Sequence, residues 1–123
     1  MSRRTASSRT APLRITRSTV VVLATASSLS EARRLANRLV RERTAACINV
    51  VPKVDSLYWW KGRVERGTEA LLIIKTRRSR LKLLNRRIQA LHSYEVPEVL
   101  ALPVSAGSHA YLRWLEESLM ISA

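Results

Sequence analysis

Residues 45–76 read AACINVVPKVDSLYWWKGRVERGTEALLIIKT, and this stretch decides the fold. Its two halves are rich in β-branched, aromatic and aliphatic residues, which favour extended strands. Between them, Lys61 and Gly62 can form a tight turn, because glycine supplies the positive φ that such a turn requires. Counting back from this turn pairs residues 70–74 with residues 48–50. The stretch therefore predicts one long β-hairpin.

Two residues predict irregularities in this hairpin. Pro52 cannot donate a backbone hydrogen bond, so a bulge or a sheet edge is expected there. Gly67 is expected to kink the returning strand opposite residues 52–55.

The segments on either side of the hairpin alternate between strand and helix. Residues 19–24 form a continuous apolar run, which predicts a buried central strand. A capping box of Ser28 and Glu31 then predicts a helix. Residues 92–97 are expected to form a loop, and residues 98–104 a final strand with a proline at its edge. Two further serines are expected to cap the remaining helices: Ser79 and Ser108.

The predicted order is strand, helix, hairpin, helix, strand, helix. This order predicts the α+β class and a ferredoxin-like split βαβ sandwich with a long β-hairpin and an extra C-terminal helix. We expect residues 18–123 to form this single domain.

The tip of the hairpin predicts an oligomer. Each arm of about 14 residues would reach about 45 Å, whereas a domain of this size has a radius of gyration of about 13 Å. The tip carries Leu57, Tyr58, Trp59 and Trp60, and alternate residues of a strand point to opposite faces, so both faces are apolar. Such a tip needs a second chain to cover it. The alternative is that the strand bends at Pro52 and returns the aromatic side chains to its own helices.

The charge of the chain leaves two interpretations open. The net charge of +13 is typical of nucleic-acid-binding proteins. It also fits a basic extension followed by helices with solvated arginines, which we favour. Residues 1–17 contain five arginines and no acidic residue, and we expect a disordered extension there. The chain has no phenylalanine and lacks the aromatic motif of an RNA-recognition domain.

The composition also indicates a compartment. A single cysteine, Cys47, and the lack of an apolar run of about 20 residues suit a protein of the cytoplasm. The Arg- and Ser-rich start leaves an organelle as the alternative.

Few residues of this sequence could carry chemistry. No metalloprotease, CxxC, serine-hydrolase or nucleotide-binding motif occurs, so we expect no catalytic residues and no enzyme. His92 lies near Tyr94, Glu95 and Glu98 and is a candidate ligand for Cu(II) or Zn. The alternative for His92 is a loop histidine that hydrogen-bonds a helix end. Lys75 ends an apolar strand, where it could meet an anion or extend into solvent.

Six blocks of the sequence together resemble one known family. They occur in order between residues 18 and 119, and they are VVVLATA at 20–26, AACINVVP at 45–52, SLYWWKG at 56–62, LIIKT at 72–76, LHSYEVPE at 91–98 and YLRWL at 111–115. The family they resemble is that of the CutA, or divalent-cation tolerance, proteins.

This resemblance implies a ferredoxin-like fold and a tight homotrimer whose hairpins extend into neighbouring subunits. It also implies a likeness to trimeric signalling proteins of the PII type, and a role in tolerance of, or response to, copper or other divalent metals. It implies no required cofactor. The expected partners are other copies of the chain and a Cu(II) or other divalent ion or a small anionic ligand, with no membrane and no nucleic acid.

The resemblance also implies site residues. It places a groove between subunits at Lys75, Tyr94 and Glu98 beside the candidate metal ligand His92, and trimer contacts at Tyr58, Trp59 and Trp60. The sequence departs from copper-linked bacterial relatives, which have a cysteine in the first strand and a His-His pair at the end of the second helix. Here these positions hold Ala24 and Leu91-His92, and Ser93 stands where proline is usual.

Three hypotheses follow from the sequence. The first is a CutA-like homotrimer for divalent-metal tolerance. The second is a PII-like trimeric regulator that binds a small molecule and has no physiological metal. The third is a basic protein associated with nucleic acid through its helix arginines.

Overall fold

The computed structural model describes residues 12–120. Its elements follow one another as β1 (Leu13–Ile15), β2 (Thr19–Ala26), α1 (Leu29–Arg41), β3 (Cys47–Trp60), β4 (Arg63–Arg77), the 3₁₀ turn η1 (Arg78–Arg80), α2 (Leu81–Leu91), β5 (Leu100–Pro103), β6 (Ala106–Ser108) and α3 (His109–Ser118). From β2 onward this is the predicted order, with β6 as an additional short strand before the last helix.

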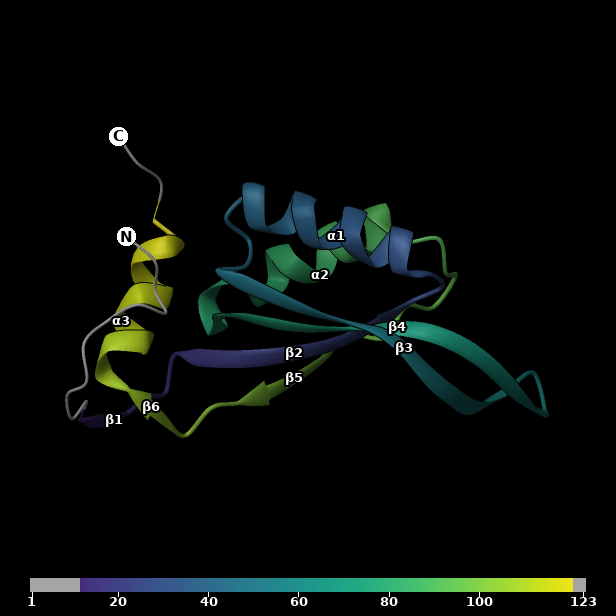
Figure 1. Cartoon of the computed structure of the whole chain (residues 1–123), viewed down its shortest axis with the longest axis horizontal. Helices are drawn as coiled ribbons and strands as arrows, with labels where there is room; N and C mark the ends of the chain where they lie inside the picture. Colours follow the sequence, from purple (N-terminus) through teal and green to yellow (C-terminus); the bar gives the residue numbers. More distant parts are fainter. Residues whose placement is uncertain (1–11, 121–123) are drawn as a thin grey trace.

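Four strands form one antiparallel sheet in the order β3-β4-β2-β5. Both α1 and α2 lie on the same face of this sheet (Figure 1). Each strand–helix–strand unit passes over one intervening strand, which is the ferredoxin-like split βαβ arrangement. The predicted α+β class and fold are confirmed.

The core lies between this sheet and its two helices. Alternate residues of β2 and β4 point toward the helices and are buried: Val20, Val22, Ala24, Ala26, Ala70, Leu72 and Ile74. The helices contribute Leu35, Leu39, Leu84 and Ile88. The residues in between, such as Leu23 and Ile73, face the other side of the sheet and are only half-buried. One face of the sheet is therefore packed, and the other is apolar but uncovered within the described chain.

The hairpin of β3 and β4 has the predicted pairing. Val50 lies opposite Leu72, and the turn places Lys61 at φ 50° and Gly62 at φ 79°. The register shifts between Val51 and Val54, so the bulge expected at Pro52 is confirmed. The kink expected at Gly67 is wrong, because this residue pairs regularly with Ser56 beyond the bulge.

The hairpin extends well past the end of the helical layer (Figure 1). Its tip does not return to the helices, and the side chains of Leu57 and Trp59 are 61% and 75% exposed. The alternative in which the strand folds the aromatic residues back onto its own core is therefore wrong. The tip is apolar and uncovered in the single chain.

The predicted helix caps have mixed outcomes. Ser28 and Ser108 each accept a backbone hydrogen bond at the start of a helix, from Glu31 and Tyr111, as predicted. Ser79 does not cap α2, because it lies within η1 and α2 follows directly without a side-chain cap.

The prediction that residues 1–17 form a disordered extension is wrong for its last part. β1 pairs with β6, with Leu13 opposite Ser108 and Ile15 opposite Ala106. Arg14 also forms an ion pair with Glu116 at 3.1 Å. Backbone hydrogen bonds and one ion pair order this segment without any buried apolar side chain, so hydrophobic patterning gives no signal for it. Residues 1–11 lie outside the described residues.

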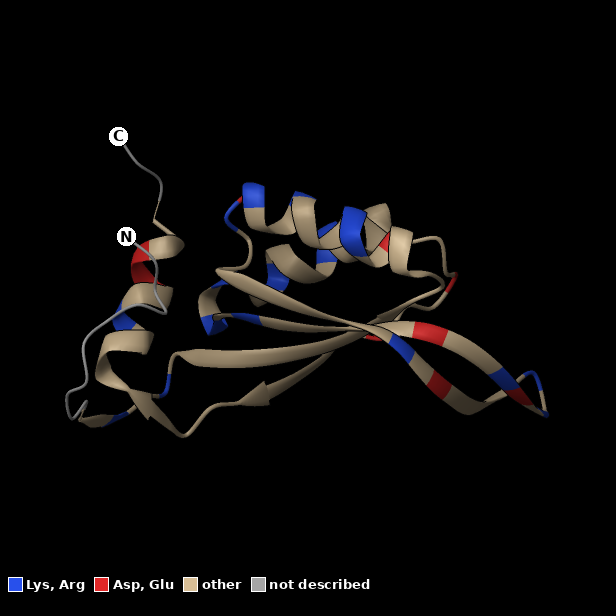
Figure 2. Ribbon diagram, in the orientation of Figure 1, with Lys and Arg blue, Asp and Glu red and all other residues tan. Residues whose placement is uncertain are grey.

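Basic residues gather on the helical layer (Figure 2). Glu42 lies among them and pairs with both Arg38 and Arg87. Within residues 12–120, no helix is long and apolar enough to cross a membrane.

Candidate functional site

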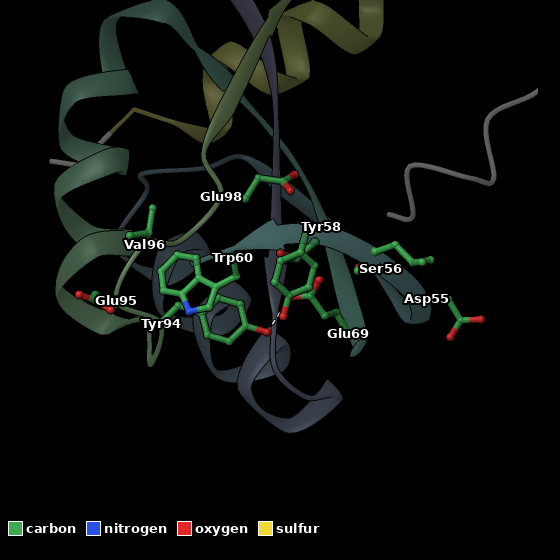
Figure 3. Close-up of a pocket in the computed structure, with 11 residues that line it drawn as sticks. Asp55, Ser56, Tyr58, Trp60, Glu69, Tyr94, Glu95, Val96 and Glu98 are labelled. Carbon is green, nitrogen blue, oxygen red and sulfur yellow. Dashed lines mark hydrogen bonds between the residues drawn. The ribbon is translucent and has the colours of Figure 1, made fainter. Parts of the chain in front are cut away.

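A pocket of about 620 Å³ lies between the hairpin and the segment that joins α2 to β5. Figure 3 shows three aromatic rings gathered near its centre, with carboxylates among and around them. The lining residues are Thr25, Asp55, Ser56, Leu57, Tyr58, Trp60, Glu69, Tyr94, Glu95, Val96 and Glu98. Its volume is within the range of small-molecule sites, roughly 300–1,000 Å³.

The strand geometry of the hairpin explains the first wall of the pocket. Ser56, Tyr58 and Trp60 are alternate residues of β3 and so share one face of it. Trp59 lies on the opposite face and is not part of the lining. Glu69 comes from β4, where it pairs with Val54 just beyond the bulge.

The segment between α2 and β5 forms the second wall of the pocket, and Tyr94 links this segment to the hairpin. Its hydroxyl donates a hydrogen bond to Oε2 of Glu69 at 2.6 Å, which links the α2–β5 connection to β4 (Figure 3). Burial raises the pKa of Tyr94 above its usual value, and the hydrogen bond to Glu69 and the nearby negative charge raise it further. The hydroxyl therefore stays protonated and remains a donor at neutral pH.

His92 lies behind this wall. Its side chain is buried, and its ring packs against that of Tyr94 at a tilt of 43°, with 4.6 Å between the centroids. Nδ1 accepts a hydrogen bond from the backbone N–H of Tyr94 at 3.0 Å, so Nε2 carries the proton and donates to the carbonyl of Thr25 at 2.6 Å. Both ring nitrogens are engaged, so His92 has a structural role. Its partners lie in β2 and in the loop itself, and not at the helix end that the alternative named.

Glu31 holds the same connection from the side of α1. Its Oε1 accepts hydrogen bonds from the backbone and hydroxyl of Ser27, and its Oε2 accepts one from the backbone N–H of Ser93. Burial raises the pKa of Glu31, but the hydrogen bonds from Ser93 and Ser27 outweigh burial and lower it from 4.5 to about 2. The buried carboxylate is therefore ionised. Through Ser93 it positions the first residues of the α2–β5 connection, which forms one wall of the pocket.

The structure brings together only part of the predicted groove. Tyr94 and Glu98 line the pocket, and Tyr58 and Trp60 line it as well. Lys75 does not, because its ammonium donates to Asn49 on the uncovered face of the sheet.

Two hairpin carboxylates of the pocket, Asp55 and Glu69, were not among the predicted site residues. The hairpin register could have predicted Glu69. It pairs Glu69 with Val54, which lies on the same face of β3 as Tyr58 and Trp60.

The described residues of one chain do not form a ready metal site. No group of three His, Cys, Asp or Glu side chains within residues 12–120 lies close enough together to hold an ion. A metal bound to His92 would have to displace one of the two hydrogen bonds of its ring.

Comparison with known proteins gives a consistent result. Residues 20–118 match the family model of the CutA1 divalent ion tolerance protein. A divalent-cation tolerance protein CutA of Thermus thermophilus is 47% identical over 98 residues, which cover 80% of this chain and 95% of that protein. Protein CutA 1 of rice, named as chloroplastic, is 46% identical over 99 residues, which cover 80% of this chain but only 56% of the rice protein. The matched segment thus spans about half the length of the plant relative.

Solved structures agree with these sequence matches. The crystal structure of CutA1 from rice is 45% identical to this chain, with a TM-score of 0.82 over 85% of this chain and 96% of that one. The structure of CutA from Synechococcus elongatus is 36% identical, with a TM-score of 0.85 over 89% of this chain and 96% of that one. In sequence and in fold, the chain belongs to the CutA1 family of divalent ion tolerance proteins.

Proposed function

We propose that the chain works as a homotrimer in divalent-cation tolerance or response and has no catalytic activity of its own. The observation that carries this proposal is the apolar hairpin tip, which extends past the core with Leu57 and Trp59 largely exposed. A single chain would leave this surface in water, and a second copy would bury it. The role in cation tolerance rests on the family.

The two edges of the sheet also support an assembly. β3 lies at one edge and β5 at the other, so each has a side without a strand partner in the described chain. Leu100 and Leu102 on β5 are 59% and 47% exposed and continue the apolar surface of the uncovered sheet face. If the β3 edge of one copy pairs with the β5 edge of the next, repeating this contact produces a closed ring when the rotation between copies divides a full turn.

The test is the mass of the purified chain by light scattering, with and without Cu(II). We expect a trimer in both conditions at low micromolar concentration. Replacing the tip residues, Trp59→Ala with Trp60→Ala, should lower the mass. A control variant, Lys53→Ala with Arg66→Ala, removes two exposed polar side chains of the same hairpin and should keep the trimer. A wild-type monomer, or a tip variant that remains a trimer, would contradict the assembly.

The copper part of the proposal is tested at His92. Cu(II) titration of the wild type, His92→Ala and His109→Ala compares the buried ring with an exposed histidine at the start of α3. Affinity lost only in His92→Ala would place copper at this ring. Equal affinity in all three chains would move the ion to another site.

A second candidate function is a PII-like regulator that binds a small molecule without a physiological metal. The pocket favours it, because its volume and aromatic walls suit an organic ligand better than an ion. We propose the cytoplasm as the compartment for either function, and the chloroplastic name of the rice relative marks the alternative.

A further inference from the structure

The pocket has a charge opposite to that of the chain. The chain has 22 Lys and Arg and only nine Asp and Glu. Four of those nine carboxylates line the pocket, and no Lys, Arg or His does. These acidic residues are Asp55, Glu69, Glu95 and Glu98. An anionic ligand would therefore meet no basic residue of the lining. Lys61 lies nearby, over the ring of Trp60, and Lys75, the candidate for that task, lies elsewhere.

These carboxylates are not neutralised by the described chain. The ion pairs with arginine within residues 12–120 involve other acidic residues, namely Glu42, Glu116 and Glu117. Glu69 has one oxygen bound to Tyr94. In Figure 3, Glu98 lies above the rings and Glu95 lies to one side of Trp60, and these two are the rim carboxylates. The side chain of Asp55 lies on the far side and points away from the rings.

The aromatic side chains add a second attraction for positive charge. Trp60, Tyr58 and Tyr94 gather in the centre of the pocket (Figure 3). The faces of such rings attract ammonium and guanidinium groups within about 6 Å of the centroid. The chain shows this at Trp60, where the ammonium of Lys61 lies 5.6 Å from the ring centroid.

The spacing of the carboxylates decides between an ion and an organic cation. A metal ion needs several ligand atoms that converge on one point. Within residues 12–120 no three acidic, histidine or cysteine side chains converge in this way. Carboxylates spread around a cavity of about 620 Å³ instead suit separated positive groups on a molecule with an apolar body.

We propose that this pocket binds an extended organic cation, such as a linear polyamine, whose ammonium groups meet the rim carboxylates while its hydrocarbon chain packs on Trp60 and Tyr58. This inference names a ligand class for the second candidate function. Every wall described here comes from one chain. Because Tyr58 and Trp60 are also the expected trimer contacts, ligand binding must be compared with the mass of the same sample.

The experiment is calorimetric titration with spermidine at low ionic strength, with the mass of each sample measured in parallel. We expect saturable binding of one spermidine per chain that weakens at 0.15 M salt by screening. Citrate, an anion, should not bind. Mg²⁺, a compact divalent cation, should not compete with spermidine.

Two matched pairs of variants place the binding in the pocket. Glu98→Gln should weaken spermidine binding about fivefold, whereas Glu117→Gln removes the same charge on α3, outside the lining, and should change it less than twofold. Trp60→Leu should also weaken it about fivefold or more. Trp59→Leu, on the other face of β3, should keep the affinity even if it lowers the mass.

Each contrary result overturns the proposal. No saturable binding would show that the pocket does not take such a cation. Equal loss in Glu98→Gln and Glu117→Gln would show that the binding is general charge attraction and not a property of the pocket. Competition by Mg²⁺ would assign the carboxylates to a metal ion. A monomeric wild type that still binds spermidine would contradict the trimer while leaving this inference intact.

Discussion

The carboxylate of Glu31 accepts a hydrogen bond from the backbone N–H of Ser93 at 2.9 Å. This contact joins the first turn of α1 to the second residue after α2, and so positions the connection that carries Tyr94. A buried charge thus positions one wall of the pocket, although it does not itself line the pocket.

This contact predicts a specific dependence of stability on pH. The pKa of Glu31 is lowered to about 2 in the folded chain, so the stabilisation is fully present above about 4.5 and is lost as the pH falls through about 2. Glu31→Gln should lower the free energy of unfolding at pH 7 by about 3 kcal/mol, on the scale of 1.4 kcal/mol per pKa unit. The difference from wild type should shrink between pH 4.5 and 2. Urea unfolding at fixed protein concentration measures it.

The control for this prediction is Glu117→Gln, which removes an exposed carboxylate paired with Arg113. Its effect should stay within a few tenths of a kcal/mol at every pH. Parallel curves for Glu31→Gln and wild type down to pH 2 would contradict the role of the ionised carboxylate.

His92 is predicted to stabilise the chain whether or not it binds copper. His92→Ala leaves the carbonyl of Thr25 and the N–H of Tyr94 without their partner in a buried place. We expect a loss of about 2–3 kcal/mol and a lower melting temperature in metal-free buffer. His109→Ala, at an exposed position, should leave the melting temperature nearly unchanged. Equal melting temperatures for the two variants would refute the structural role.

The strand β1 is predicted to contribute to stability. Removing residues 1–17 deletes β1, whereas removing residues 1–11 leaves it in place. The difference between the two truncated chains should be about 1–2 kcal/mol, from the ion pair of Arg14 with Glu116 and the backbone pairing. Thermal unfolding of both chains measures it. Identical unfolding curves would mean that β1 adds nothing.

The hairpin turn predicts a contrast between two glycines. Gly62 has φ +79°, where a Cβ is strained, so Gly62→Ala should destabilise the chain by about 1 kcal/mol. Gly67 has no such φ, and a Cβ there would meet nothing closer than the hydroxyl of Tyr58 at 3.9 Å. Gly67→Ala should therefore be neutral or slightly stabilising. The reverse order in denaturant unfolding would contradict the turn geometry.

Local patterns predicted most of the fold. The alternation of apolar residues, Pro52 and the pair Lys61 and Gly62 define the hairpin, because each acts through the backbone at its own position. The cap predicted at Ser79 is wrong, since this serine lies inside a 3₁₀ turn that leads directly into α2.

The pocket and β1 could not be predicted in the same way. The hydrogen bond of Tyr94 with Glu69 joins residues that are 25 positions apart, and its geometry depends on how the connection packs on the sheet. The pairing of β1 with β6 uses backbone groups that every sequence possesses. In both cases the information lies in the tertiary structure and not in a local motif.

The ion pair of Arg14 with Glu116 joins residues 102 positions apart, whereas the hairpin closes around a two-residue turn. During synthesis the hairpin can form as soon as β4 has left the ribosome, but β1 must wait for almost the whole chain. The hairpin can therefore pair early in synthesis, whereas the pairing of β1 with β6 and the ion pair of Arg14 with Glu116 can form only near its end. Order of assembly is in this way encoded in the distances along the chain.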